Sequence, residues 1–484
     1  MKLNYKRTIL VGFAFFLISA FWQAYDTIIP LVLTNHYGMP QDLSGLIMSA
    51  DNILAVFMLP IFGALSDKIN SRFGRRTPFI FIGTILAIIF FGLLFIINAN
   101  QLNAILESQI PTLRAEADAL LEMANESKDP AMRELANAKL AEVQKMAMQI
   151  TKNNSGTLIA FIVVLLLTLI SMATFRSPAV ALMPDVTVKP LRSKGNAIIN
   201  LMGAAGGIIV LGLGIIFKTS KRPYMDLSGY IFAVCALMAI ALVVFVFTVK
   251  ERKWVALMEA DSEKYGIEEA AAEEGGEKRK LSKPELISLL LILASVALWY
   301  IGYNSITSKY SVYASNVLHF DYNATLIIAQ AAAICSYVPV GFLASKIGRR
   351  RSILIGVAML ATAFLFATFI TSSSSPFFMY VIFILAGIGW ATINVNSFPM
   401  VVELAKGGDV GKYTGYYYTA SMSAQIVTPI LSGILIERVF GWGIFFPYAA
   451  FFVACSFITM YFVKHGDAKA EKTDALDALG GADD

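Results

Sequence analysis

Twelve apolar runs, separated by polar connections, constrain the fold of this chain more than any other feature of its sequence. A helix needs about 20 apolar residues to cross the hydrocarbon core of a bilayer. The first six runs cover residues 8–33, 43–65, 77–97, 157–183, 196–217 and 227–248. The other six cover residues 284–305, 325–344, 352–371, 376–402, 413–436 and 442–463. Because backbone polar groups in lipid must be satisfied within the protein, the sequence predicts an all-α membrane protein with twelve transmembrane helices.

The composition agrees with this class and argues against several kinds of site. Of the 484 residues, 57% are hydrophobic and 15% are charged, whereas a soluble domain carries about 25% charged residues. The cysteines lie within apolar runs and give no disulfide framework, and the histidines lie in connections or the tail. We therefore expect no metal site, no histidine relay and no cofactor. The residues concerned are Cys235, Cys335, Cys455, His36, His319 and His465.

Three polar segments interrupt or follow the apolar runs. Residues 99–155 contain apolar positions at helical spacing with a break at 127–130, which predicts an external hairpin of two amphipathic helices. Residues 250–283 are dense in charge of both signs, which is typical of a flexible linker. Residues 465–484 are polar and acidic and predict a disordered tail. Lysine and arginine concentrate on the side of both termini, which predicts that the termini are cytoplasmic.

The sequence repeats its own pattern in two halves, residues 1–249 and 284–464. The second run ends in a loop with Gly63, Asp67, Arg75 and Arg76, and the eighth ends in a similar loop with Arg349. Gly63 and Asp67 share a helix face, where the glycine permits close helix approach. Asp185 follows the fourth run and Glu403 follows the tenth, with a glycine ten residues after Asp185 and another twelve residues after Glu403. Two six-helix repeats are a known plan of secondary transporters.

The loop at 63–79 resembles the signature loop of the major facilitator superfamily, and its longer form resembles the sucrose–proton symporter branch. The resemblance implies a transporter in which the acid at Asp67 caps a helix of the other half and is released during alternating access. We therefore expect the two loops, with Asp185 and Glu403, to form a gate. The alternative is a cytoplasmic anchor loop that only fixes the orientation in the membrane.

Three charged residues lie deep within predicted helices. They are Asp26, Asp51 and Arg176, and Arg176 is the one cation that the predicted boundaries place there. Such a charge costs at least about 2.5 kcal/mol and marks a functional site or a structural ion pair. We expect these residues to carry ion coupling; a structural pair lining a wet cavity is the alternative. No second acid lies four residues after Asp51, so the sodium site of the melibiose-type branch is not carried over.

Sugar recognition requires aromatic faces beside polar side chains. The runs at 8–33 and 284–305 combine both and occupy equivalent places in the two halves, and the run at 376–402 does so as well. The candidate substrate-binding residues are Trp22, Tyr25, Trp299, Tyr303, Asn304, Trp390 and Asn394. Lipid-facing or interfacial positions are the alternative for any single aromatic residue.

These patterns predict a proton-coupled symporter of a glycoside, such as the disaccharides sucrose or maltose, monomeric in the cell membrane. A sodium-coupled symporter, a sugar effluxer and a lipid or lysolipid carrier on the same fold are the alternatives. A membrane-bound transferase would carry clustered carboxylates for a metal at the membrane edge, and the sequence contains none. We therefore expect neither enzyme activity nor a nucleic-acid partner.

Overall fold

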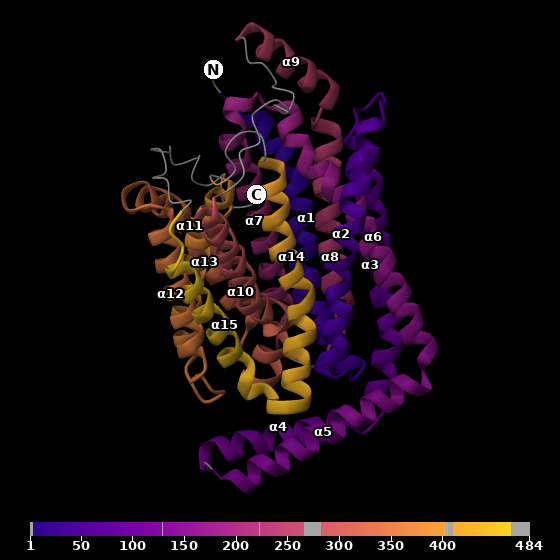
Figure 1. Ribbon diagram of the computed structural model, residues 1–484. Coiled ribbons are helices and arrows are strands. Elements are labelled where there is room, and N and C mark those ends of the chain that lie inside the picture. The colour runs from indigo at the N-terminus through magenta and orange to yellow at the C-terminus, as the bar shows by residue number, and fades with distance from the viewer. Residues whose placement is uncertain are drawn as a thin grey trace.

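The computed structural model describes residues 3–127, 129–221, 223–265, 282–402, 404 and 410–465. These residues form long α-helices joined by short connections, as Figure 1 shows. Eleven helical segments in this described part are long and apolar enough to cross a membrane, and the last of them, Lys412–Tyr461, contains two helices. The predicted all-α architecture of twelve transmembrane helices is therefore confirmed.

The N-terminal half supplies six of these helices. They are α1 (Tyr5–Leu31, continued by a π-helical turn at Val32–His36), α2 (Gln41–Lys68), α3 (Thr77–Leu106), α6 (Ser155–Val186), α7 (Arg192–Phe217) and α8 (Ser228–Thr248). The bounds of five of them lie within about four residues of the predicted runs, because the long apolar stretches leave little choice of position. The exception is α3, which continues to Leu106, beyond the predicted end at residue 97 and into the segment predicted as hairpin.

The C-terminal half supplies the other six. These are α10 (Lys283–Tyr313, continued at Ala314–Leu318), α11 (Tyr322–Ile347), α12 (Arg349–Ala367), α13 (Pro376–Val402), α14 (Val410–Ile434, continued at Leu435–Phe440) and α15 (Phe445–Tyr461). In this half the largest difference from the sequence prediction is α10, which was expected to end at residue 305 and continues to Tyr313. Its polar last turns are buried between neighbouring helices, so a criterion of apolar length alone stopped too early.

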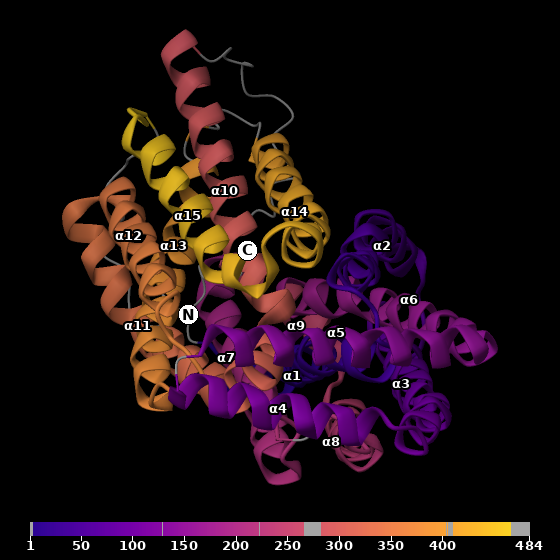
Figure 2. The same cartoon turned by 90° about the horizontal axis from the view of Figure 1, so that it is seen from below.

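The helices α4 (Ile110–Ser127) and α5 (Pro130–Asn153) form a hairpin that lies across one end of the bundle (Figures 1 and 2). We call this end the hairpin end. The hairpin is fixed to the N-terminal half, because Gln101 of α3 donates to Thr151 Oγ1 at 2.8 Å and Thr151 Oγ1 donates to the carbonyl of Tyr37 at 2.9 Å. A small apolar cluster that includes Ile105 and Val143 packs beneath it.

The opposite end of the bundle carries α9 (Glu251–Lys264), and we call it the linker end (Figure 1). The sequence predicted a flexible linker over 250–283, and for 251–264 that prediction is wrong. The helix forms because its first residue, Glu251, is bound into the N-terminal half and is only 1% exposed. The predicted disordered tail, beyond residue 465, lies outside the described residues.

The two halves approach most closely between α2 and α14, near the hairpin end. A Cβ atom added at Gly45 would collide with the backbone of Pro429, and one added at Gly433 would collide with the backbone of Gln41. Only glycine permits two helices to approach at such short range. These two glycines therefore allow the halves to close at the hairpin end.

Candidate functional site

Arg76 is the centre of the charged loop at the linker end. Its guanidinium lies 2.5 Å from Asp67 Oδ1 and 2.8 Å from Asp185 Oδ2, and it donates to the hydroxyl of Ser66. Burial disfavours its charge, but Asp185 and Asp67 outweigh burial and raise the pKa of Arg76. Arg76 therefore links the acid of its own loop to the acid at the end of α6.

Glu251, the first residue of α9, also belongs to this group, and the sequence analysis did not predict it. Its carboxylate accepts the backbone N–H groups of Arg75, Arg76 and Thr77 at 2.6 to 2.9 Å and the hydroxyl of Thr77 at 2.7 Å. The first N–H groups of a helix have no intrahelical partner and attract negative charge. Glu251 therefore caps α3 and ties α9 to the loop. We call Asp67, Arg76, Asp185 and Glu251 the linker-end cluster.

The other predicted gating residues surround this cluster or lie in the second half. Arg75 lies 3.9 Å from Asp185. Gly63 allows α2 to approach α6, since an added Cβ atom would lie 2.9 Å from Ser177 Oγ. Arg349 begins α12 and has an interaction partner. Glu403 lies outside the described residues. Within the described part of the chain, the linker-end cluster joins loop and helix ends of the N-terminal half to α9, and Asp67 pairs with Arg76 of its own loop.

The structure brings together the three charged residues of the membrane interior. Asp26 from α1 and Asp51 from α2 interact electrostatically with each other and with Arg176 from α6. All three side chains are half-buried, and no direct ion pair among them is present. Asn52 donates to Asp51 at 2.8 Å. We call these three residues the acid–arginine group.

Two aromatic residues of α1 flank this group. The guanidinium of Arg176 lies 5.6 Å from the centre of the Trp22 ring, within range of a cation–π interaction. Tyr25 is fully buried and stacks on Phe21. The Trp22 indole N–H and the Tyr25 hydroxyl are both buried without a hydrogen-bond partner. These are unused polar groups beside the charged residues.

The C-terminal half presents its own aromatic group between α10 and α13. Tyr303 stacks on Trp390 with ring centres 3.7 Å apart, and Tyr300 meets Trp390 edge-on at 5.5 Å. The side-chain NH₂ of Asn304 is buried without a partner, whereas Asn394 has one. Trp299 is fully buried, so in this conformation it has the placement of a core residue.

Contact between the halves near the middle of the bundle involves two further residues. Gln330 of α11 donates to Gln23 of α1 at 2.5 Å. Arg176 also interacts electrostatically with Tyr418 of α14, which belongs to the C-terminal half. The acid–arginine group therefore lies at the boundary between the two halves.

A second polar network closes the hairpin end, and the sequence analysis did not predict it. Arg438 donates to Asp42 Oδ2 at 2.8 Å, and the backbone N–H of Gln41 donates to Glu437 at 2.9 Å. Lys309 is 2% exposed and donates to the carbonyl of Gln41 at 3.0 Å. We call these five residues the hairpin-end gate. Lys309 is a second buried cation within a helix, in the last turns of α10 beyond the end predicted at residue 305.

Comparison with known proteins places this architecture in a family. The model of the Major Facilitator Superfamily matches residues 11–110 and 327–478, just over half of the chain. The chain therefore belongs to the Major Facilitator Superfamily.

Individual relatives are more distant. The chain is 36% identical over 101 residues to the human "Proton-associated sugar transporter A", a match that spans 21% of this chain and 12% of that protein. It is 26% identical over 131 residues to the "MFS-type transporter ppzB" of Metarhizium rileyi, which spans 27% of this chain and 26% of that protein.

Two solved structures show the same fold over nearly the whole chain. The inward-open xylose transporter XylE from E. coli has a TM-score of 0.62 and 13% identity, covering 98% of this chain and 99% of that one. A D-xylose–proton symporter has a TM-score of 0.60 and 14% identity, covering 96% and 99%. At these identities the similarity establishes the fold.

Proposed function

We propose that this protein is a proton-coupled symporter that imports a glycoside, such as the disaccharides sucrose or maltose. The observation that carries the proposal is the position of the acid–arginine group at the boundary between the halves, beside Trp22 and within electrostatic range of Tyr418. Ionisable side chains within a membrane are costly and mark ion or substrate pathways.

Alternating access provides the mechanism. The hairpin-end gate joins the two halves, while the partners that the described residues give to the linker-end cluster come from the N-terminal half and α9. This arrangement corresponds to a conformation closed at the hairpin end. Rocking of the halves would break the hairpin-end gate and bring the linker ends together, as expected for transporters built from two repeats.

Proton and sugar are coupled through the acids. Like charges on Asp26 and Asp51 repel, so protonation of one relieves the repulsion. A sugar that displaces water beside them increases the preference for the protonated form, and this linkage couples the two loads. A membrane potential supplies about 2.3 kcal/mol per charge per 100 mV, against about 1.4 kcal/mol for each tenfold sugar gradient. One proton therefore supports an accumulation of more than tenfold at 100 mV.

Aromatic and amide groups on both sides of the boundary fit a sugar. Trp22 lies in one half, and the Tyr303–Trp390 stack with Asn304 lies in the other. Ring faces accept the apolar side of a sugar, and buried donors without partners are available to its hydroxyls. The names of two relatives, a proton-associated sugar transporter and a D-xylose–proton symporter, support the same substrate class and ion.

The test is uptake of radiolabelled sucrose, maltose and xylose into vesicles under separate pH and sodium gradients. We expect a pH step to drive accumulation and Asp26→Asn or Asp51→Asn to abolish it while sugar exchange continues. Asp261→Asn, which changes an exposed acid on α9, is the matched control. Undiminished uphill accumulation in both Asp26→Asn and Asp51→Asn would disprove proton coupling, and transport of a lysolipid with no sugar would disprove the substrate class.

A further inference from the structure

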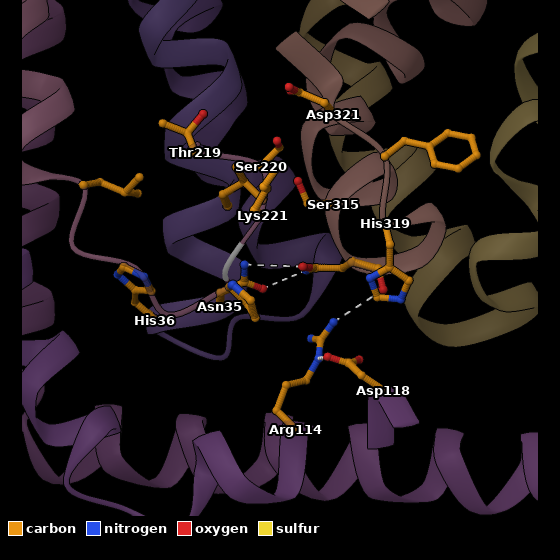
Figure 3. Close-up of a pocket in the computed structure, with 15 residues that line it drawn as sticks. Asn35, His36, Arg114, Asp118, Thr219, Ser220, Lys221, Ser315, His319 and Asp321 are labelled. Carbon is orange, nitrogen blue, oxygen red and sulfur yellow. Dashed lines mark hydrogen bonds and ion pairs between the residues drawn. The ribbon is translucent and has the colours of Figure 1, made fainter. Parts of the chain in front are cut away.

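A cavity of about 320 Å³ lies beneath the hairpin, outside the acid–arginine group (Figure 3). We call it the hairpin pocket. Its volume is at the lower end of the range of about 300–1,000 Å³ found for small-molecule sites. Its walls come from the N-terminal half, from α4 of the hairpin and from the connection between α10 and α11. Representative residues of these three walls are Asn35, Ser220, Arg114, Asp118, Ser315 and Asn316.

Among the described residues, two cations and two acids line the hairpin pocket, Arg114 and Lys221 against Asp118 and Asp321, so their formal charges cancel. Arg114 donates to both carboxylate oxygens of Asp118, at 2.9 and 3.0 Å. Asp321 accepts from the backbone and side chain of Asn323 at 3.0 and 3.1 Å. Burial lowers the pKa values of His319 and His36, the latter to about 4, so both rings are neutral at pH 7. The lining therefore favours a neutral ligand over a strongly charged one.

Hydroxyl and amide groups supply the polar chemistry of this pocket. Ser220 is 8% exposed, and its hydroxyl and that of Ser315 are buried without a hydrogen-bond partner. A hydroxyl can both donate and accept, and a buried polar group without a partner is costly. Leu31 and Phe320 add apolar surface to the same lining. Hydroxyl groups beside apolar faces match the two kinds of surface of a sugar.

The walls of the hairpin pocket are held together only while the hairpin end is closed. Asn316 of the C-terminal half donates to Asn35 of the N-terminal half at 2.7 Å, and Arg114 donates to the carbonyl of Asn316 at 3.4 Å (Figure 3). Separation of the halves would divide the pocket. A ligand that touches both halves binds better to the closed form and shifts the population towards it.

We propose that the hairpin pocket binds a neutral polyhydroxyl ligand of the sugar class and that the bound ligand holds the hairpin end closed. The pocket and the acid–arginine group share no lining residue, so this site goes beyond the proposed transport site and needs no ion gradient to bind. An external sugar would then regulate how often the hairpin end opens.

The test measures closure of the hairpin end by distances between nitroxide labels. Glu107→Cys and Ser373→Cys place labels at exposed positions on the two halves at this end, in a background with the three native cysteines replaced by serine. Maltose and xylose are titrated in detergent without a gradient. We expect either or both sugars to increase the population with the short distance. The double variant Ser220→Ala/Ser315→Ala should need about tenfold more sugar for the same shift, since it loses two hydroxyl partners.

Ser311→Ala is the matched control, because Ser311 is also a buried serine without a partner, one turn before Ser315 and outside the hairpin pocket. No shift with either sugar, or an equal shift in the double variant and the control, would overturn the proposal. The Asp26→Asn variant distinguishes the hairpin pocket from the proposed transport site. In this variant, sugar should still close the hairpin end. Loss of closure in Asp26→Asn would assign the effect of sugar to the acid–arginine group and overturn the hairpin-pocket proposal. Closure by a sugar that the wild type does not transport would support the hairpin-pocket proposal and refute the proposed function.

Discussion

The two ends of the bundle use charged residues in opposite ways. At the linker end, Arg76 binds Asp67 and Asp185 within one half. At the hairpin end, Arg438 binds Asp42 across the two halves. Under the proposed alternating-access mechanism, a charged cluster at a helix end acts as a gate only when its partners belong to the two halves that move apart. In this conformation the hairpin-end gate is engaged, and the linker-end cluster stabilises the N-terminal half.

The largest effect is expected from Arg76→Gln. The Arg76 side chain is 7% exposed and Asp185 is 19% exposed, and removal of one member of a buried ion pair costs roughly 3 kcal/mol or more. We therefore expect a clear fall in the free energy of unfolding, measured by denaturation in detergent. Asp67→Asn should cost less than about 1 kcal/mol, because Asp67 is 58% exposed.

If Arg76→Gln unfolds like the wild type but alters the label distances at the hairpin end, the contrast drawn between the two ends is wrong. The linker-end cluster would then act on the opening of the halves instead of on the stability of one half. Glu251→Gln offers a second check, because it weakens the cap of α3 while leaving the two carboxylates beside Arg76 in place.

The sequence predicted one end of the bundle much better than the other. Asp67, Arg75 and Arg76 lie in one short loop, where a local pattern shows them together. Glu251 was missed because the charge density of 250–283 indicated a linker, and nothing local shows that its carboxylate reaches back to α3. The helices themselves were predictable, since their apolar length is dictated by the bilayer.

The hairpin-end gate could not be predicted from local patterns. Its members come from three distant places, 41–42, 309 and 437–438, and they meet only after the halves have folded together. The predicted end at residue 305 also placed Lys309 in a loop, although α10 continues to Tyr313. Asp26, Asp51 and Arg176 were identified because a charge inside an apolar run is visible without knowledge of its neighbours.

A smaller effect is expected from the pH dependence of His36 at the hairpin end. Its Nδ1 lies 3.1 Å from Asn98 Oδ1, and burial lowers its pKa from about 6.5 to about 4. The unfolded chain therefore binds a proton between pH 6.5 and pH 4 while the folded protein does not. The folded protein therefore keeps its full free energy of unfolding above about pH 6.5 and loses part of it as the pH falls towards 4. From pH 7 to pH 5 the loss is about 2 kcal/mol.

Thermal unfolding at pH 7 and pH 5 checks this assignment. The His36→Gln variant should lose less stability on acidification than the wild type, because it lacks the titrating ring. His465→Gln, which changes a histidine beside Ser288 at the linker end, is the control. Equal acid sensitivity of His36→Gln and the wild type would show that His36 is not responsible.

The smallest effect is expected from Asp42→Asn, and it tests the comparison most directly. Asp42 is 8% exposed on its side chain, whereas its partner Arg438 is 68% exposed, so the ion pair is worth less than a fully buried one. The variant also removes a negative charge close to the buried Lys309. In the open form water solvates these groups, so the change weakens the closed form selectively. We expect about a tenfold shift towards the open hairpin end, or about 1.4 kcal/mol, and a loss in the free energy of unfolding no larger than this. Labels at Glu107→Cys and Ser373→Cys report the populations, and Glu142→Gln, an exposed acid on α5, is the control. An unchanged distance distribution in Asp42→Asn would mean that the apolar helix contact at Gly45 and Gly433 closes this end without help from the charges.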